Sequence, residues 1–305
     1  MSEIPTSPSF EDESFQAQNK QTDSQQKPKK IWLGLGVIVA VLVILGVGGL
    51  IAKKTFLTPK EETPVPTPTK KVLEPVNMIE LRERPFISLK PKTDGHNLYI
   101  DIASLPKPAT SVEYELEYQT GSMLQGAFGE IELTDLPIEE EVFLGSCSAG
   151  GACTFHEDIK GGSILTRFKG DQNYALKSDF RWWEARRDDN QFASRDAKFQ
   201  LTSDDLAKNA YVIIFNGAGL PDVDKLKGEI ASDIYVIGAS NHLKGKADSI
   251  KLRAKTNDAT HIAYWIEGEG WEYLQANIGE SEKELVAENV PLAQVYLAVK
   301  YTNYE

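Results

Sequence analysis

The chain has 305 residues, a length typical of about two domains, and its 41% apolar and 26% charged residues suit a folded protein. The net charge is -12 and the sequence pI is about 5.0. Such an acidic chain argues against nucleic acid as a partner, because phosphate binding needs clustered lysine and arginine side chains.

Residues 1–30 are rich in Ser, Gln, Glu, Lys and Pro and hold almost no aliphatic cluster. Such a segment buries too little apolar surface to fold. We therefore expect a disordered tail.

Residues 31–52 form an apolar run without a charged side chain. As a helix the run would be about 33 Å long, which matches a hydrocarbon core of about 30 Å. Trp32 lies at its start, where membrane helices carry aromatic residues. The run is longer than the apolar region of a signal peptide, and no small-residue cleavage site precedes Lys53. We expect an uncleaved, single transmembrane helix whose partner is the lipid bilayer.

Lysine counts on the two sides of this run are nearly equal, with four in the fifteen residues before it and three in the fifteen after it. The positive-inside rule alone therefore does not orient the helix. A disulfide in the C-terminal part, argued below, favours a cytoplasmic N-terminus and an extracytoplasmic C-terminal domain at the cell membrane.

Residues 53–78 contain alternating prolines between positions 59 and 75. This spacing favours polyproline II, which acts as a semi-rigid spacer of about 3.1 Å per residue. We expect a stalk that holds the next domain away from the membrane.

From residue 79 the pattern changes to short segments in which apolar and polar residues alternate. Residues 112–118 show it most clearly, with Val, Tyr, Leu and Tyr on one face and three glutamates on the other. Several short strands with one polar face indicate an antiparallel sandwich. The strands expected in residues 79–202 are 98–102, 112–118, 129–133, 142–147, 163–169, 174–182 and 197–201.

A second block of expected strands follows in residues 203–305. The strands are 210–215, 234–237, 249–255, 261–266, 271–274 and 294–301, and residues 281–288 suit one or two helical turns. The predicted fold class is therefore mainly β, with tandem antiparallel β-sandwich units of the fibronectin or immunoglobulin kind at 79–202 and 203–305. One large mixed-β domain is the alternative.

Cys147 and Cys153 are the two cysteines of the chain, with Gly150 and Gly151 between them. A disulfide here would close a short loop and contribute roughly 2.4 kcal/mol on the chain-entropy model. A lone pair of cysteines suits a structural bridge outside the cytoplasm. We predict that they are bonded.

Arg181, Trp182, Trp183 and Arg186 form the most distinctive polar and aromatic cluster of the sequence. On a strand, adjacent tryptophans point to opposite faces, so one is expected in the core and the other outside. An outward Trp beside Arg could stack on a sugar ring or contact a protein. These four residues are the predicted binding face, against the plainer reading of core and rim packing.

No catalytic, metal or cofactor site is predicted. Cys153 lies near His156, but a bonded cysteine has no thiolate and no third orienting group is identifiable. The four histidines lack zinc-site spacing, and the Asp-rich loops do not match a calcium loop. Whether the chain is an enzyme stays open, with the balance against it.

Several stretches together resemble a family of single-pass membrane proteins of candidate-phyla bacteria, of the Patescibacteria and Microgenomates type. The resemblance covers about residues 30 to 200, and it implies a bacterial envelope location and a fibronectin- or immunoglobulin-like sandwich. It implies no activity and no site residues. The stretches are Ile87-Ser88-Leu89-Lys90-Pro91 with Asp94-Gly95-His96, Ser111-Val112-Glu113-Tyr114-Glu115-Leu116, Leu144-Gly145-Ser146-Cys147-Ser148 through Cys153, and Leu165-Thr166-Arg167-Phe168-Lys169-Gly170.

The expected function is that of a membrane-anchored binding or scaffolding protein of the cell envelope, whose partner is an envelope protein or a glycan. An envelope hydrolase acting on wall polymers is one alternative. A structural component of a surface or secretion assembly is the other.

Overall fold

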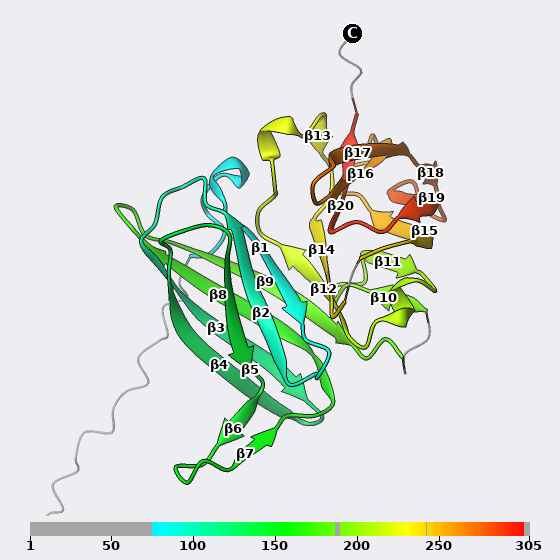
Figure 1. Ribbon diagram of the computed structural model, residues 1–305. Helices are drawn as coiled ribbons and strands as arrows, with labels where there is room; N and C mark the ends of the chain where they lie inside the picture. The colour runs from blue at the N-terminus through cyan, green and yellow to red at the C-terminus, as the bar shows by residue number, and fades with distance from the viewer. Residues whose placement is uncertain (1–74, 187–189, 242, 302–305) are drawn as a thin grey trace, which may run out of the picture. The chain divides into compact units, whose positions relative to one another are not determined.

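The computed structural model describes residues 75–186, 190–241 and 243–301, which form a mainly β structure with antiparallel sheets (Figure 1). Three short 3₁₀ turns occur, η1 Leu81–Glu83, η2 Leu206–Lys208 and η3 Val223–Lys225, and these residues contain no α-helix. The strands are β1 Phe86–Pro91, β2 Asn97–Ser104, β3 Ser111–Thr120, β4 Met123–Glu132, β5 Ile138–Phe143, β6 Gly145–Cys147, β7 Cys153–Phe155, β8 Ile159–Lys169, β9 Tyr174–Trp183, β10 Gln191–Ala193, β11 Phe199–Thr202, β12 Val212–Gly217, β13 Glu229–Ile230, β14 Ile234–Ala239, β15 Lys246–Arg253, β16 His261–Ile266, β17 Gly270–Gln275, β18 Asn277–Ile278, β19 Glu284–Pro291 and β20 Val295–Lys300.

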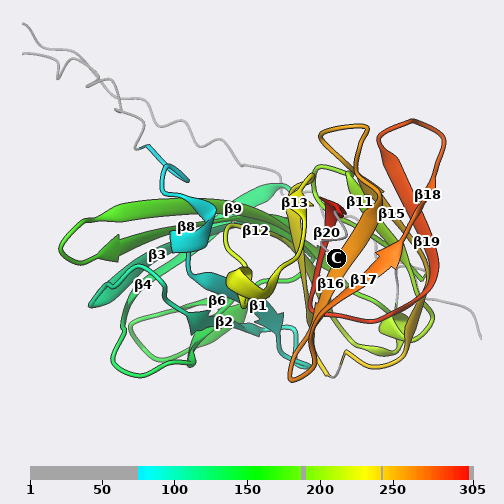
Figure 2. The same ribbon diagram turned by 90° about the horizontal axis from the view of Figure 1, so that it is seen from above.

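The largest sheet has ten strands and runs through both predicted sandwich units. Its order is β17-β16-β20-β14-β12-β9-β8-β3-β4, and β13 pairs with β20. A three-stranded sheet, β1-β2-β5, and a five-stranded sheet, β10-β11-β15-β19-β18, accompany it. Figure 2 shows β3, β4 and β8 at one end of this region and β18 and β19 at the other.

The central strands of the large sheet contribute side chains to two hydrophobic cores. Ile213 and Phe215 of β12 belong to the core that holds β1, β2 and β3, whereas Val212 and Ile214 belong to the core that holds β11 and β15. A strand covered on both faces reads as a continuous apolar run, because both sets of alternating side chains are buried. This explains the unbroken run at residues 211–215.

The strands β3, β8 and most of β9 have a core on one face only, while Trp183 at the end of β9 packs against the second core. Tyr114, Leu116 and Tyr118 of β3 are buried, while Glu115 and Glu117 between them are exposed. The predicted alternation in residues 112–118 is thus confirmed. The opposite face of these three strands carries the site described below.

The predicted boundary between residues 202 and 203 falls in the connection from β11 to β12. Residues on both sides of it pair directly, since Phe180 of β9 lies opposite Phe215 of β12. The described residues all belong to one compact unit, Val72–Glu305. The division into two separately folding domains stays a prediction.

The helical turns suggested for residues 281–288 are wrong. The strand β19, Glu284–Pro291, occupies most of this segment and pairs with β15, so that Leu285 and Ala287 enter a core. Their period of two, with Val286 facing the other way, is the signal of a strand.

The predicted tail, transmembrane helix and stalk at 1–30, 31–52 and 53–78 lie outside the described residues, except for the last four stalk positions. Within the described part of the chain, no helix has the length and apolar character needed to cross a membrane.

Candidate binding groove along β9

β9 positions the predicted binding residues by simple alternation. Leu176, Phe180 and Trp182 point into the core, and Trp182 is only 4% exposed. Lys177, Asp179, Arg181 and Trp183 lie on the other face of the strand. The two adjacent tryptophans therefore have different environments, one buried and one half-buried.

Trp183 is held firmly on three sides. Its indole Nε1 donates a hydrogen bond to the Ala193 carbonyl oxygen at 3.2 Å. The Phe192 ring packs edge-on against it at 5.9 Å between centroids, and the Arg181 Cζ lies 4.0 Å from the centroid of the Trp183 ring. A guanidinium above an indole face is a cation–π contact. Arg181 and Trp183 thus form one stacked unit on the open face.

Arg186, the fourth predicted residue, is exposed and follows Ala185 in the loop after β9. It does not line the hollow that holds Arg181 and Trp183. The structure therefore brings together three of the four predicted residues. Trp182 is buried in the core and also borders this hollow.

A groove runs along this face of β9 as three adjoining hollows. The first, of about 620 Å³, contains Arg181 and Trp183. The second, of about 590 Å³, shares Gly161 and Arg195 with the first. The third, of about 330 Å³, shares Lys177 and Asp179 with the second. The floor from residue 177 to residue 183 spans six residue steps, or roughly 20 Å of strand.

The turn between β10 and β11 forms one wall of this groove. Arg195 of the turn donates to the Gly162 carbonyl oxygen at 3.0 Å and pairs with Asp179 at 3.3 Å. These contacts connect the turn to β8 and to β9. Sequence reasoning missed Arg195, because only the tertiary structure brings it to β9.

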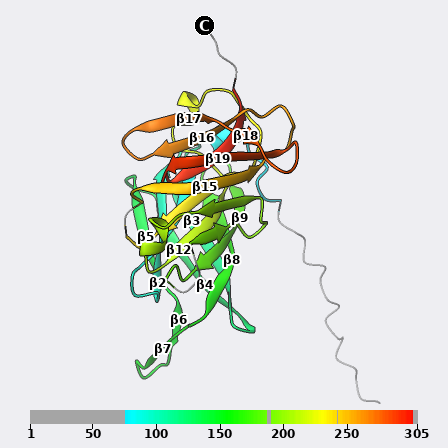
Figure 3. The same ribbon diagram turned by 90° about the vertical axis from the view of Figure 1, so that its right-hand side faces the viewer.

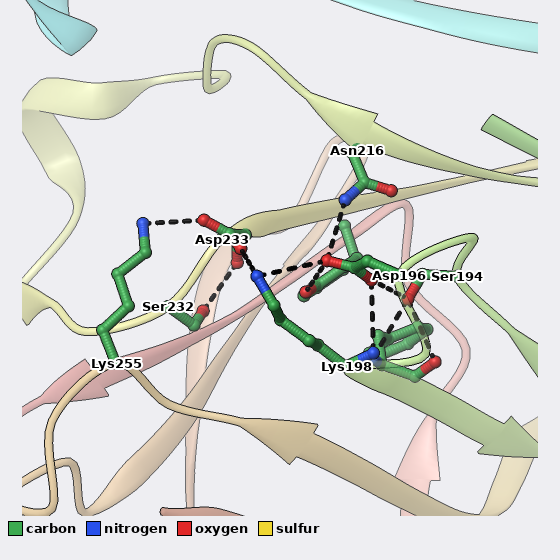
Figure 4. A network of polar contacts seen from close by, with 9 residues as sticks. Ser194, Asp196, Lys198, Asn216, Ser232, Asp233 and Lys255 are labelled. Atoms are coloured by element: carbon green, nitrogen blue, oxygen red, sulfur yellow. Dashed lines mark hydrogen bonds and ion pairs between the residues drawn. The ribbon is translucent and has the colours of Figure 1, made fainter. Parts of the chain in front are cut away.

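Next to Arg195 lies a polar network centred on Asp196 and Asp233, which also line the groove (Figure 4). Asp196 Oδ1 accepts hydrogen bonds from the Ser194 hydroxyl at 2.5 Å and from the Lys198 backbone N–H at 3.2 Å. Lys198 Nζ lies 2.9 Å from Asp233, and Lys255 Nζ lies 2.7 Å from the other oxygen of Asp233. The network fixes the turn that carries Arg195.

The pKa of Asp233 is lower than its ordinary value. Partial burial of the carboxyl disfavours its charge, but hydrogen bonds and attraction from Lys255 and Lys198 together outweigh burial. Asp233 is therefore ionised at neutral pH and acts as the anion that holds the two lysines.

The groove is electrically balanced, unlike the chain as a whole. Its lining holds six cationic side chains and six carboxylates, whereas the chain has a net charge of -12. Within the described residues, neither Lys177 nor Arg181 has a carboxylate within 4.0 Å. The cations are Arg84, Lys160, Lys177, Arg181, Arg195 and Lys255, and the carboxylates are Glu117, Asp158, Asp179, Glu184, Asp196 and Asp233.

The floor offers side chains to a ligand but little backbone. β9 pairs with β8 from Tyr174 to Arg181 and with β12 from Phe180 to Trp183, and Asn77 hydrogen-bonds the backbone of Ala175 and Lys177. Most of the N–H and C=O groups of β9 are therefore engaged. A ligand in the groove therefore meets few free backbone groups. It meets alternating donors and acceptors and one stacked aromatic unit instead.

The disulfide between Cys147 and Cys153 is present and joins β6 to β7, with a Cα–Cα distance of 4.0 Å. This small hairpin extends from the rest of the described region (Figure 3). The bond confirms the predicted pairing, and it leaves no free thiol for His156.

His156 has two neighbours that the sequence did not indicate. Its Nδ1 lies 2.9 Å from the Tyr118 hydroxyl, and its Nε2 lies 3.1 Å from the Ser146 hydroxyl. Burial raises the pKa of Tyr118 to about 12, so this phenol is neutral at physiological pH. None of the hollows of the groove includes this contact, which fastens the disulfide hairpin to β3.

Among the described residues, no group of three or more His, Cys, Asp or Glu side chains is placed to hold a metal ion. Two carboxylates of the Asp-rich loops have lysine partners instead. Asp205 pairs with Lys208, and Asp222 pairs with Lys225.

The three comparisons, with protein-family models, with curated proteins and with solved structures, find no match to this chain.

Proposed function

We propose that this chain is a membrane-anchored binding protein of the cell envelope, and that the groove along β9 binds an extended glycan. The observation that carries the proposal is the stacked Arg181–Trp183 unit in a groove lined by charged hydrogen-bonding groups. A half-exposed aromatic unit gives a sugar ring a flat surface, and the charged groups give its hydroxyls partners.

A glycan fits this lining better than a peptide does. Each sugar hydroxyl can donate and accept a hydrogen bond, which suits a groove where cations and carboxylates alternate. An extended peptide would need either a free strand edge or apolar pockets for its side chains. Most of the backbone of the floor strand β9 is engaged by β8, β12 or Asn77, and the groove lining is dominated by polar residues.

Binding is favoured over hydrolysis by the state of the groove carboxylates. Asp179 is paired with Arg195, and Asp196 accepts from Ser194 and from backbone. A glycoside hydrolase needs one carboxyl that can protonate the leaving oxygen and a second that acts as base or nucleophile. Carboxylate oxygens that already have these partners are less available to a glycosidic bond.

The cellular arrangement belongs to the same proposal. The apolar run at residues 31–52 anchors the chain, the proline-rich stalk follows, and the β-rich region lies outside the cytoplasm as fibronectin- or immunoglobulin-like sandwiches. The disulfide between Cys147 and Cys153 supports this side, because such bonds persist in oxidising compartments.

Calorimetric titration of the full-length chain in detergent with soluble glycan strands from peptidoglycan tests the proposal. Wild type should bind, and the double variant Lys177→Ala/Arg181→Ala should lose about a hundredfold or more in affinity, since each charged hydrogen bond contributes about 1.5–3 kcal/mol. The matched control Lys251→Ala/Arg253→Ala removes the same charges from β15, outside the groove. Equal loss in both variants, or no binding by wild type, contradicts a glycan site in this groove.

A further inference from the structure

The strand β4 ends the ten-stranded sheet and leaves one edge free. Within the described residues it pairs only with β3, through all ten positions from Met123 to Glu132. A free edge presents a row of backbone N–H and C=O groups to which another strand can pair. Natural edges are usually blunted by Lys, Pro or short length. β4 contains neither Lys nor Pro and is long.

The hairpin geometry fixes which residues point their backbone outward. Thr120 and Met123 flank the two-residue turn and form its closing pair. Closing pairs of two-residue hairpins exchange hydrogen bonds, and bonded pairs then alternate along the strands. The outward N–H and C=O groups therefore belong to Leu124, Gly126, Phe128 and Glu130.

Apolar side chains stand exposed beside this edge. Phe128 is 84% exposed, Leu124 65% and Met123 62%. Phe128 also borders a hollow of about 460 Å³ whose charged lining is Glu113, Glu115, Glu130 and Arg167. A large exposed ring beside a polar hollow is a typical anchor of an interaction surface.

The charge around the edge is negative. The neighbouring carboxylates are Glu113, Glu115, Glu117, Glu130 and Glu132. Lys169 pairs with Glu113 and Glu130, and Arg167 pairs with Glu115. Glu117 and Glu132 have no ion pair among the described residues. The surface thus offers more carboxylates than the local cations neutralise.

We propose that β4 is a docking edge for an extended segment of a partner protein in which basic and apolar side chains alternate. The backbone of that segment pairs with the outward groups of β4, as in strand addition. One of its Lys or Arg side chains enters the hollow beside Phe128, where three carboxylates outnumber their two cationic partners, Arg167 and Lys169, and the ring face also attracts a cation.

A second copy of this chain fits the edge poorly. Antiparallel pairing of two β4 strands about Phe128 would bring Glu130 and Glu132 of both copies onto one face. The glutamates of the two β3 strands would lie on the same face, so the joined sheet would carry twice the unneutralised negative charge of one copy, which is unfavourable. Charge complementarity therefore selects a basic partner strand.

Fluorescence anisotropy with the full-length chain and a labelled peptide of alternating Val and Lys tests the proposal. Wild type should bind this Val–Lys peptide and should not bind the matched Val–Glu peptide. Its affinity for the Val–Lys peptide should fall as the salt concentration rises. Phe128→Ala should weaken binding about threefold to tenfold. Phe128→Pro should abolish binding, because it removes an outward N–H that β3 does not use.

Two further variants keep the test independent of folding and of the groove. Glu115→Gln/Glu130→Gln should weaken binding of the Lys peptide, whereas Lys177→Ala in the groove floor should leave it unchanged. Circular dichroism verifies the fold of each variant. Equal binding of both peptides, or binding unaffected by the Phe128 variants, overturns the proposal. Dimerisation of wild type that Phe128→Pro removes, seen by sedimentation, also overturns it in favour of a second copy.

Discussion

The Arg181 guanidinium carbon lies 4.0 Å from the centroid of the Trp183 ring, on the open face of β9. The contact follows from the strand period, because residues 181 and 183 share a face while Trp182 enters the core. The ring in turn is fixed by its hydrogen bond to Ala193. A ligand in the groove therefore meets a guanidinium that is already oriented.

Replacement of Arg181 should separate stacking from charge. Arg181→Ala should weaken glycan binding about tenfold or more, because it removes a planar group with several charged donors. Arg181→Lys keeps the charge but not the planar stack, so it should bind with intermediate affinity. Calorimetric titration measures both. Wild-type affinity in both variants would mean that Arg181 does not touch the ligand.

Gly162 should tolerate no side chain. A Cβ at this position would overlap the Glu117 carbonyl oxygen of the neighbouring strand β3, so β3 and β8 would have to separate. Gly162→Ala should lower the free energy of unfolding by about 1–3 kcal/mol, as overpacking does. Urea denaturation measures the loss. Gly126→Ala is the control, since its Cβ would meet ordinary contact at 3.5 Å; equal effects of the two changes would refute the close approach.

The ionisation of Asp233 should make stability depend on pH in the acid range. Its folded-state pKa lies below the ordinary value of 3.8, so the ionised carboxyl stabilises the fold. That contribution is complete above pH 3.8 and is lost as pH falls through the lower folded-state pKa. Wild type should therefore lose stability in this window more steeply than Asp233→Asn, as chemical denaturation at a series of pH values will measure. Parallel curves for the two proteins would contradict the ion pairs to Lys198 and Lys255.

The shared sheet should make the described region unfold in one step. Ile213 and Ile214 are adjacent on β12, yet they belong to different cores. Loss of either core therefore exposes one face of the same strands. Calorimetry should give a single transition. Ile213→Ala and Ile214→Ala should each lower its midpoint temperature, because each change reduces the free energy of unfolding by about 2–5 kcal/mol. Two transitions that respond separately to these changes would establish two independently folding sandwiches.

The sequence predicted the elements whose pattern is local. The alternation at 112–118 and the apolar run at 210–215 gave β3 and β12, because burial on one or on both faces leaves a visible period. For β4 it predicted only the C-terminal part, as the strand expected at 129–133, because Gly126 and Gly129 weaken the strand signal. It failed for β19, where a period of two was read as a helix.

The candidate site could be predicted only in part, because only residues on the same strand share a local sequence pattern. Arg181 and Trp183 stand out as neighbours in sequence, and β9 keeps them together. Arg195 and Asp196 lie in a turn between two short strands, and no local pattern links them to β9. Only the pairing of β11 with β15 and the contact of Arg195 with Asp179 bring this wall to the groove.

Amide hydrogen exchange of the full-length chain, with and without glycan strands, tests the central claim most directly. Addition of the glycan should slow exchange in the β10–β11 turn at residues 194–198 and at the β3–β4 turn beside Gln119, which border the groove. Exchange in β2 and β5, on the far side of the core, should not change. Protection confined to β2 and β5, or no protection at saturating glycan, would contradict the assignment of this groove as the ligand site.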